Sequence, residues 1–302
     1  MLHDFLNYLR YELNRAPLTI EAYKNDISQF QMWISPQNPD EVDFISVTSS
    51  DIRSWLASLA KSGQSSRTLR RKIISLRALF KWLIKTGKMN VSPLRDVPLP
   101  KIPKPLPDFI KTDEIEKALT WLADDSDSPE ALMKTLIMEI FYSLGIRRAE
   151  LIALNDSDIS FHNAEIKVTG KRSKQRVIPV PQSLLTLIKK WQQLRNESLG
   201  IPSIDSPLFI LKGKRITPAQ VYSIVHEALA DSTARKKSPH ALRHSFASAM
   251  LNGGAEIDSV KEFLGHSSLA TTQIYTHISF SEIQKAYSNA HPRSQNKTEK
   301  EL

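Results

Sequence analysis

The feature that most constrains the fold is a cluster of prolines about a third of the way along the 302-residue chain. Five of them fall within ten residues: Pro98, Pro100, Pro103, Pro105 and Pro107. Proline fixes φ at about −65° and donates no amide hydrogen bond, so this spacing excludes a helix and favours an extended, semi-rigid connector. We therefore expect a first domain at 1–96, a linker at 97–107 and a second domain at 108–302.

The segment before the prolines has the pattern of four short amphipathic helices. Apolar residues recur at helical spacing in four stretches: Phe5, Leu6, Leu9 and Leu13; Ile20, Tyr23, Ile27, Phe30 and Ile34; Ile52, Trp55, Leu56 and Leu59; and Leu69, Ile73, Leu76, Phe80 and Leu83. Thr19 is expected to cap the second helix, Ser49 or Ser50 to open the third, and Gly87 to close the fourth. Four such helices can bury one small core.

The stretch from Arg67 to Lys104 is strongly basic. It holds eleven lysines and arginines and one acid, Asp96, in a chain of net charge +9. Solvated helices usually mix both signs, because opposite charges at i and i+4 stabilise them, so this excess favours contact with nucleic-acid phosphates. A solvated face is the alternative. The residues expected on DNA are Arg67, Arg70, Arg71, Arg77, Lys81, Lys101 and Lys104.

The second domain is expected to be mainly helical with a small antiparallel sheet. Helical patterns recur at 112–123, 129–144, 182–197, 217–229, 240–252 and 256–263. Two β-branched runs flank a polar stretch from Lys171 to Gln175 and predict a β-hairpin. Tyr142 and Tyr222 lie in apolar helical patterns and are expected in the core. The predicted fold class is mainly α, with two domains, the second of them α+β.

Composition excludes several classes of protein. No apolar run approaches the ~18 residues of a membrane span, and the N-terminus lacks the regions of a signal peptide. Cysteine is absent, which excludes disulfides, thiolate metal sites and a cysteine nucleophile. There is no P-loop pattern, and no carboxylate cluster suited to Mg²⁺ lies near the motifs below. We expect a cytoplasmic protein that uses no metal.

Four separated segments carry candidate chemistry. They read GIRRAEL (145–151), TGKRSKQR (169–176), SPHALRHSFA (238–247) and LGHSSLATTQIYTH (264–277). Their order and spacing resemble the tyrosine recombinase, or phage integrase, family, and most closely the bacterial Xer-type chromosome-dimer recombinases. The resemblance covers nearly the whole chain, including a His-Pro-Arg sequence at 291–293. It implies an N-terminal four-helix, SAM-like domain that binds DNA and a C-terminal catalytic domain.

The resemblance implies six catalytic residues: Arg147, Lys171, His240, Arg243, His266 and Tyr275. Tyr275 takes the place of the nucleophile that forms a 3′-phosphotyrosine, and His240 that of the base that accepts its proton. Arg147 and Arg243 would hold the phosphate, because arginine forks match its oxygens and stay protonated at working pH.

The remaining assignments concern proton delivery and orientation. Lys171 would protonate the leaving 5′-oxygen, with Lys174 as the alternative in the same hairpin. His266 would hydrogen-bond a phosphoryl oxygen. Glu150 lies one helical turn from Arg147 and would orient an arginine. Ser238 and Pro239 have the pattern of an N-cap and first helical residue, which puts the His-x-x-Arg pair on one helix face.

The resemblance also implies the partners. These are double-stranded DNA with paired inverted half-sites, the protein itself or a related recombinase in a tetramer on DNA, and a septal DNA translocase. No cofactor or ATP is needed, since the phosphotyrosine conserves the bond energy. A mobile-element integrase, a type IB topoisomerase and a non-catalytic sequence-specific DNA-binding protein are the alternatives. A C-terminal tail helix with Phe280, Ile283 and Tyr287 on one face would pack on its own domain or, as the resemblance favours, on a neighbour.

Overall fold

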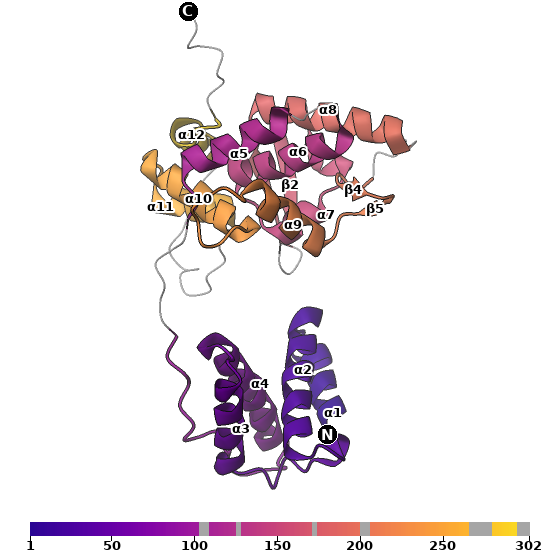
Figure 1. Ribbon diagram of the computed structural model, residues 1–302, viewed down its shortest axis with the longest axis vertical. Helices are drawn as coiled ribbons and strands as arrows, with labels where there is room; N and C mark the ends of the chain where they lie inside the picture. Colours follow the sequence, from indigo (N-terminus) through magenta and orange to yellow (C-terminus); the bar gives the residue numbers. More distant parts are fainter. Residues whose placement is uncertain (103–108, 125–127, 171–173, 200–205, 266–279, 295–302) are drawn as a thin grey trace, which may run out of the picture. The chain divides into compact units, whose positions relative to one another are not determined.

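The computed structural model of the protein describes residues 1–102, 109–124, 128–170, 174–199, 206–265 and 280–294. The chain divides into two compact units, Met1–Lys104 and Pro105–Leu302 (Figure 1). The first is helical and the second combines helices with short antiparallel strands, so the predicted fold class is confirmed. Within the described parts of the chain, no helix is long and apolar enough to cross a membrane.

The N-terminal unit is the predicted four-helix bundle. Its helices are α1 (Leu2–Asn7), α2 (Pro17–Ile34), α3 (Ser49–Lys61) and α4 (Ser66–Lys85), with a π-helical turn η1 (Tyr8–Glu12) and a 3₁₀ turn η2 (Pro39–Glu41). The four apolar stripes meet in one core, where the rings of Phe30 and Trp55 pack edge to face with centroids 5.0 Å apart. Ser49 opens α3 as predicted, after a capping box between Thr48 and Asp51.

The prediction that Thr19 caps the second helix is wrong. That helix begins two residues earlier, at Pro17, with Ala16 as its N-cap. Proline suits a first helical position because its fixed φ is already helical and its missing N–H would have no partner there.

A buried carboxylate, Asp26 of α2, is surrounded by side chains of α4. The Lys72 ammonium lies 3.2 Å from Asp26 Oδ1, the Ser75 hydroxyl donates to Oδ2 at 2.8 Å, and Arg71 also pairs with Oδ2. Lys72 is only 3% exposed. Two members of the basic stretch therefore have a carboxylate partner supplied by another helix, and Lys72 belongs to the core.

The first residues of the proline-rich segment pack along α4. The Arg77 guanidinium donates to the Val97 carbonyl at 2.8 Å, and Arg70 donates to the Pro100 carbonyl at 3.5 Å. Val97 is buried in the N-terminal core. This half of the segment is therefore held on the N-terminal unit.

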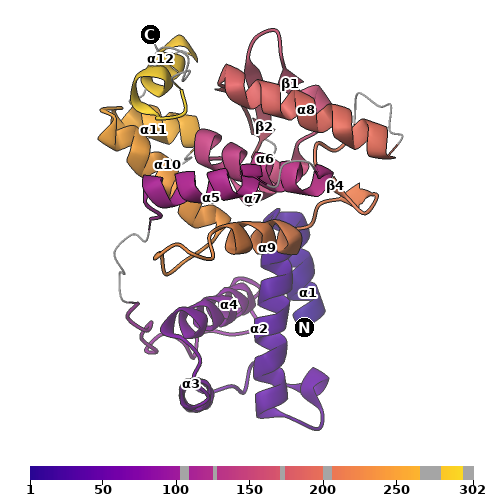
Figure 2. The same cartoon turned by 45° about the horizontal axis from the view of Figure 1, so that its top comes forward.

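The C-terminal unit is built around one buried helix. Its helices are α5 (Thr112–Asp124), α6 (Pro129–Leu144), α7 (Arg148–Ala153), α8 (Gln182–Leu199), α9 (Pro218–Ala228), α10 (Pro239–Asn252), α11 (Ile257–Leu264) and α12 (Phe280–Ala290). Most of α6 from Ala131 to Leu144 is buried, and the helix packs against α5, α8, α9 and α10 (Figure 2). Tyr142 lies in this core as predicted.

The hairpin predicted around 164–180 is confirmed. Strands β2 (Glu165–Thr169) and β3 (Gln175–Pro179) pair antiparallel, with Thr169 opposite Gln175. A two-residue strand, β1 (Ile159–Ser160), follows the 3₁₀ turn η3 (Asp156–Asp158) and extends the sheet, while β4 (Ile210–Leu211) and β5 (Lys214–Arg215) form a separate hairpin. Strands of two residues are too short to show a period in the sequence.

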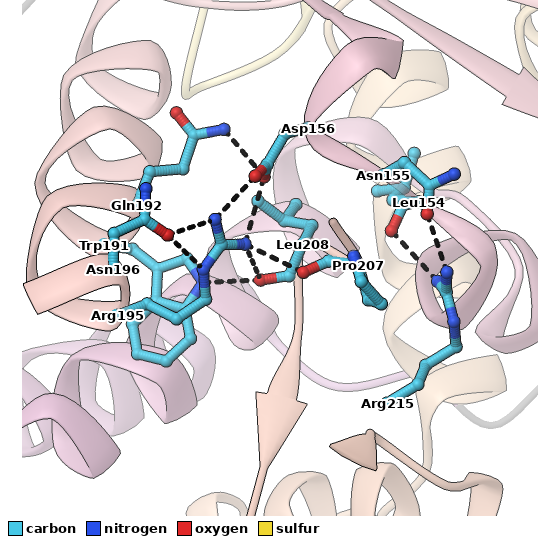
Figure 3. Close-up of polar contacts among 10 residues, drawn as sticks. All are labelled: Leu154, Asn155, Asp156, Trp191, Gln192, Arg195, Asn196, Pro207, Leu208 and Arg215. Atoms are coloured by element: carbon cyan, nitrogen blue, oxygen red, sulfur yellow. Dashed lines mark hydrogen bonds and ion pairs between the residues drawn. The ribbon is translucent and has the colours of Figure 1, made fainter. Parts of the chain in front are cut away.

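A buried arginine holds α8 to the segment after α7 (Figure 3). Arg195 is fully buried and donates to both carboxylate oxygens of Asp156, at 3.0 and 2.5 Å, and to the carbonyls of Pro207 and Leu208, at 2.8 and 3.0 Å. Arg215 similarly donates to the Ile152 carbonyl at 2.7 Å. A buried charge deprived of these partners would be strongly destabilising, so the cluster fixes this part of the fold.

The tail helix α12 packs on its own unit. Tyr287 is 3% exposed and stacks on Phe263 at a centroid distance of 5.4 Å. The helix end also approaches Gly253, where a Cβ would lie 2.0 Å from the Ala290 carbonyl oxygen. After the helix, Arg293 pairs with Glu116 of α5 at 2.8 Å. Tyr287 therefore packs on its own unit, which is one of the two alternatives for this face.

Candidate active site

Arg147 lies at the start of α7 and is fixed by Glu150. Its backbone N–H donates to Glu150 Oε2 at 2.8 Å and its guanidinium to Oε1 at 2.7 Å. A third bond, of 3.0 Å, runs from Nη2 to the Gly265 carbonyl. The preceding turn needs Gly145, which has φ of 55° and at which a Cβ would lie 2.4 Å from the Phe246 ring. The side chain of Arg147 is 40% exposed, so it can reach a ligand.

Arg243 stands on α10, which begins as predicted. Ser238 is the N-cap, its hydroxyl accepting from the Ala241 amide, and Pro239 is the first helical residue. Arg243 is only 5% exposed and donates to the Gly145 carbonyl at 2.6 Å and the Leu264 carbonyl at 2.8 Å. Burial, together with the charge of nearby Arg147, lowers the pKa of Arg243 to about 10, so it is still charged at neutral pH.

The guanidiniums of Arg147 and Arg243 lie at the same place in the C-terminal unit, the end of α11. Arg147 binds the carbonyl of Gly265 and Arg243 binds that of Leu264, so the guanidiniums rest on consecutive carbonyls at the end of α11. Both line an open pocket of about 490 Å³ together with His240. Two cationic forks beside an imidazole can hold a phosphodiester and accept a proton next to it.

His240 lies in the first turn of α10, next to a second histidine. Its Nε2 is 3.1 Å from Nε2 of His244, and the two rings meet edge to face at 4.4 Å. Partial burial, followed by the charges of His244, Arg243 and Lys236, lowers the pKa of His240 below its ordinary value of 6.5. The imidazole is therefore mostly neutral at pH 7, the form that accepts a proton.

Glu150 joins Arg147 to a third arginine, Arg176 of β3. Arg176 donates to both carboxylate oxygens of Glu150, at 2.9 and 3.0 Å, and through Nε to the Phe263 carbonyl at 3.0 Å. Glu150 is 2% exposed. Burial alone would raise its pKa, but the hydrogen bonds from Arg176 and Arg147 lower the pKa of Glu150 to about 2. The carboxylate is thus always ionised at working pH.

Of the predicted catalytic residues, the structure brings Arg147, His240 and Arg243 together. Lys171, His266 and Tyr275 lie outside the described residues. Two glycines, Gly170 and Gly265, immediately precede the first two of these in sequence. A Cβ at Gly170 would be 3.3 Å from Glu150 Oε1, and a Cβ at Gly265 would be 3.2 Å from the Arg176 side chain. Both glycines therefore lie against the Glu150–Arg176 pair.

The residues expected on DNA differ in what surrounds them. On α4, Arg67 and Lys81 are exposed, Arg71 is exposed but pairs with Asp26, and Arg70 and Arg77 are half-buried against the proline-rich segment. Lys101 is exposed, and Lys104 lies outside the described residues. Arg67 and Lys81 are the strongest candidates on this helix for contact with phosphates.

Sequence reasoning missed two residues of the site. Arg176 could have been found by strand alternation, because it points to the same face as buried Ile178. The prediction that Tyr222 is core is wrong: it is 45% exposed and lines the pocket. Arg148, next to Arg147, also lines the pocket, but its guanidinium donates to the Pro218 carbonyl at 3.4 Å. The sequence around Tyr222 shows no signal that separates it from an ordinary helix residue.

Comparison with known proteins agrees with this geometry. Residues 108–282 match the phage integrase family, and residues 2–87 match the N-terminal SAM-like domain of phage integrases. The chain belongs to the phage integrase family. It is a tyrosine recombinase of Xer-like type, an enzyme of site-specific DNA recombination, and its partner is DNA.

Similar proteins span both units. The tyrosine recombinase XerC of Alcanivorax borkumensis is 36% identical over 97% of this chain and 94% of its own length. The tyrosine recombinase XerD of Listeria monocytogenes is 33% identical over 97% of this chain and 99% of its own. Among solved structures, the XerH recombinase bound to palindromic difH DNA is 26% identical, with a TM-score of 0.69 over 95% of this chain and 83% of that one.

Proposed function

We propose that this recombinase cleaves and rejoins DNA through a 3′-phosphotyrosine at Tyr275, in the pocket lined by Arg147, Arg243 and His240. The observation that carries this assignment is the pair of guanidiniums held on the consecutive carbonyls of Leu264 and Gly265. They present two cationic forks to one anion, and the negative charge of a pentacoordinate phosphate grows on the oxygens they would contact. Removing either arginine is expected to cost on the order of 10²–10³ in rate.

The chemistry is an exchange of phosphate esters. The Tyr275 oxygen bonds to phosphorus as the bond from phosphorus to the 5′-oxygen breaks. The tyrosine proton passes to His240, whose lowered pKa keeps it neutral and able to accept. Lys171 gives a proton to the leaving 5′-oxygen, and His266 donates to a non-bridging oxygen. Attack by the 5′-hydroxyl of the other duplex reverses these steps and releases Tyr275, so no external energy source enters.

The biological task we propose is Xer-like resolution of chromosome dimers in the cytoplasm. Full-length similarity to XerC and XerD proteins at 33–36% identity supports it. The working complex would be a tetramer on two DNA sites with inverted half-sites, formed with itself or a related recombinase, and a septal DNA translocase would be a further partner. Integration of a mobile element uses the same chemistry and is the second candidate.

A suicide DNA substrate, nicked near the cleavage point, tests the chemistry. The intact protein should form a covalent protein–DNA band, and Tyr275→Phe should form none while still binding the DNA. Strand exchange between two sites then separates a recombinase from a topoisomerase, which would relax supercoils without joining sites. An adduct that persists in Tyr275→Phe would place the nucleophile elsewhere, and a protein that only binds would be a non-catalytic DNA-binding protein.

A further inference from the structure

Arg176 occupies the junction of three elements that each carry a part of the proposed site. Its own strand, β3, begins four residues after Lys171 in the sequence. Its two terminal nitrogens hold Glu150 on α7, and its Nε holds the carbonyl of Phe263 on α11. The side chain is 16% exposed. All three of its guanidinium nitrogens bind protein groups, and Arg176 is not among the residues that line the pocket with Arg147 and Arg243, so the side chain is suited to hold the site together rather than to bind a phosphate itself.

Glu150 links Arg176 to Arg147, because its carboxylate accepts hydrogen bonds from both. Its Oε1 accepts both the Arg176 bond of 2.9 Å and the Arg147 guanidinium bond of 2.7 Å. Its Oε2 accepts from Arg176 at 3.0 Å and from the Arg147 backbone at 2.8 Å. Without Arg176, the buried carboxylate would keep Arg147 as its one charged partner among these contacts and would lose the two bonds that fix its plane.

We propose that Arg176 is a positioning residue for strand cleavage, which sets the direction of the Arg147 guanidinium through the Glu150 carboxylate. The same side chain keeps β3 in register with the end of α11, where Gly265 packs against it and where Arg147 and Arg243 find their carbonyls. This inference rests on the proposed role of Arg147 in holding the scissile phosphate.

The conservative variant Arg176→Lys tests the proposal. Lysine keeps one positive charge beside Glu150 but cannot make the two-pronged bond. DNA binding should stay within about twofold of the intact protein, because a misdirected Arg147 affects the transition state more than ground-state binding. Single-turnover cleavage of a suicide substrate should slow by about 10–100-fold, the effect of moving a positioned group by roughly 1 Å. Rates are compared at a temperature where thermal unfolding shows both proteins to be folded.

A methylphosphonate at the cleavage point distinguishes positioning from general damage. In this substrate a methyl group replaces one non-bridging oxygen and removes the negative charge of the diester, so its transition state depends less on the direction of Arg147. The ratio of intact to Arg176→Lys rates should fall to about threefold or less on it. Arg195→Lys is the matched control, since Arg195 is a buried arginine that pairs with Asp156 and binds a different set of residues, shown in Figure 3. Any cleavage defect of Arg195→Lys should be equal on both substrates.

A double variant completes the test. If Arg176 acts through Arg147, Arg176→Lys with Arg147→Lys should cleave no more slowly than Arg147→Lys alone. Effects that multiply, or a rate ratio that is unchanged on the methylphosphonate, would overturn the proposal. If Arg147→Lys instead cleaves as fast as the intact protein, or the intact protein forms no adduct, then the proposed function of the site fails and this inference fails with it.

Discussion

The Arg176 guanidinium grips the Glu150 carboxylate with two parallel hydrogen bonds, of 2.9 and 3.0 Å, inside the C-terminal unit. Such a fork-to-fork pair holds the carboxylate in one plane. Arg147 donates to the same carboxylate from its backbone N–H and from its guanidinium. The single Glu150 side chain therefore binds three groups: these two at the start of α7 and the Arg176 guanidinium on β3. Glu150 therefore couples the stability of this unit to the geometry of its site.

Acid should weaken the fold through Glu150. Its pKa is about 2 in the folded protein and ordinarily 4.5, so the unfolded chain binds its proton first as the pH falls. The stabilisation is complete above pH 4.5 and disappears between pH 4.5 and about 2. A difference of this size corresponds to roughly 3 kcal/mol. Denaturant unfolding from pH 7 to pH 2 should show that Glu150→Gln loses less stability than the intact protein on acidification. Parallel curves would assign the acid sensitivity to other carboxylates.

Lys171→Ala should be slow on normal DNA, because nothing then protonates the leaving 5′-oxygen; a slowing of about 10²–10⁴ is typical of removing a general acid. A 5′-bridging phosphorothiolate has a leaving group that needs no proton, and it should restore most of the rate in a single-turnover assay. Lys174→Ala is the matched control, since Lys174 is exposed and follows Lys171 by three residues. Rescue of Lys174→Ala instead would shift the general acid to that position.

The pH profile of cleavage should respond to His244. Burial lowers the pKa of His240, and the charge of His244 lowers it further, so the base loses its proton with a midpoint below the ordinary value of 6.5. Cleavage should therefore rise with pH around a midpoint that lies below that value. The variant His244→Ala removes one cause of the lowered His240 pKa. The midpoint of the pH–rate profile should therefore move up toward 6.5, but stay below it because His240 is still partly buried. A midpoint that stays in place would mean that the titrating base is not His240.

Removing positive charge from α4 should weaken DNA binding by a similar factor for every DNA sequence. We expect Arg67→Gln with Lys81→Gln to reduce the slope of log affinity against log salt by about one unit for each phosphate that the protein no longer neutralises. Lys189→Gln with Lys190→Gln on α8 removes the same charge from another exposed surface and serves as the control. Equal slopes in the two double variants would mean that the basic face of α4 is exposed to solvent and does not contact DNA phosphates. The measurement is the dissociation constant at several salt concentrations.

Sequence periodicity was sufficient for the elements that bury a regular stripe. The helices of the N-terminal bundle, α6 and the β2–β3 hairpin follow from it, because burial on one face imposes a period of 3.6 or 2 residues. Local chemistry also placed Ser238 and Pro239 at the start of α10, but the same reasoning failed at Thr19, where Pro17 two residues earlier was the stronger signal. Competing caps within one turn cannot be ranked by residue type alone.

The sequence could not predict contacts between residues that lie far apart along the chain. The basic stretch on α4 contains no acidic residue. Its carboxylate partner is Asp26, more than forty residues away, which pairs with Arg71 and with the buried Lys72. Strand alternation places Arg176 on the same face as buried Ile178, but its partner Glu150 lies 26 residues away and follows from no local pattern. The partner of a buried charge is fixed by packing, which no local pattern encodes.

The carbonyls of Leu264 and Gly265, which belong to the protein itself, hold the guanidiniums of Arg243 and Arg147. An arginine side chain that becomes fixed gives up rotamer entropy equivalent to up to about 2 kcal/mol. Here that cost falls largely on folding rather than on DNA binding or on the chemical step. The phosphate thus enters a site whose dipoles are already oriented, and calorimetry of DNA binding should show little of the entropic penalty that ordering two arginines would otherwise add.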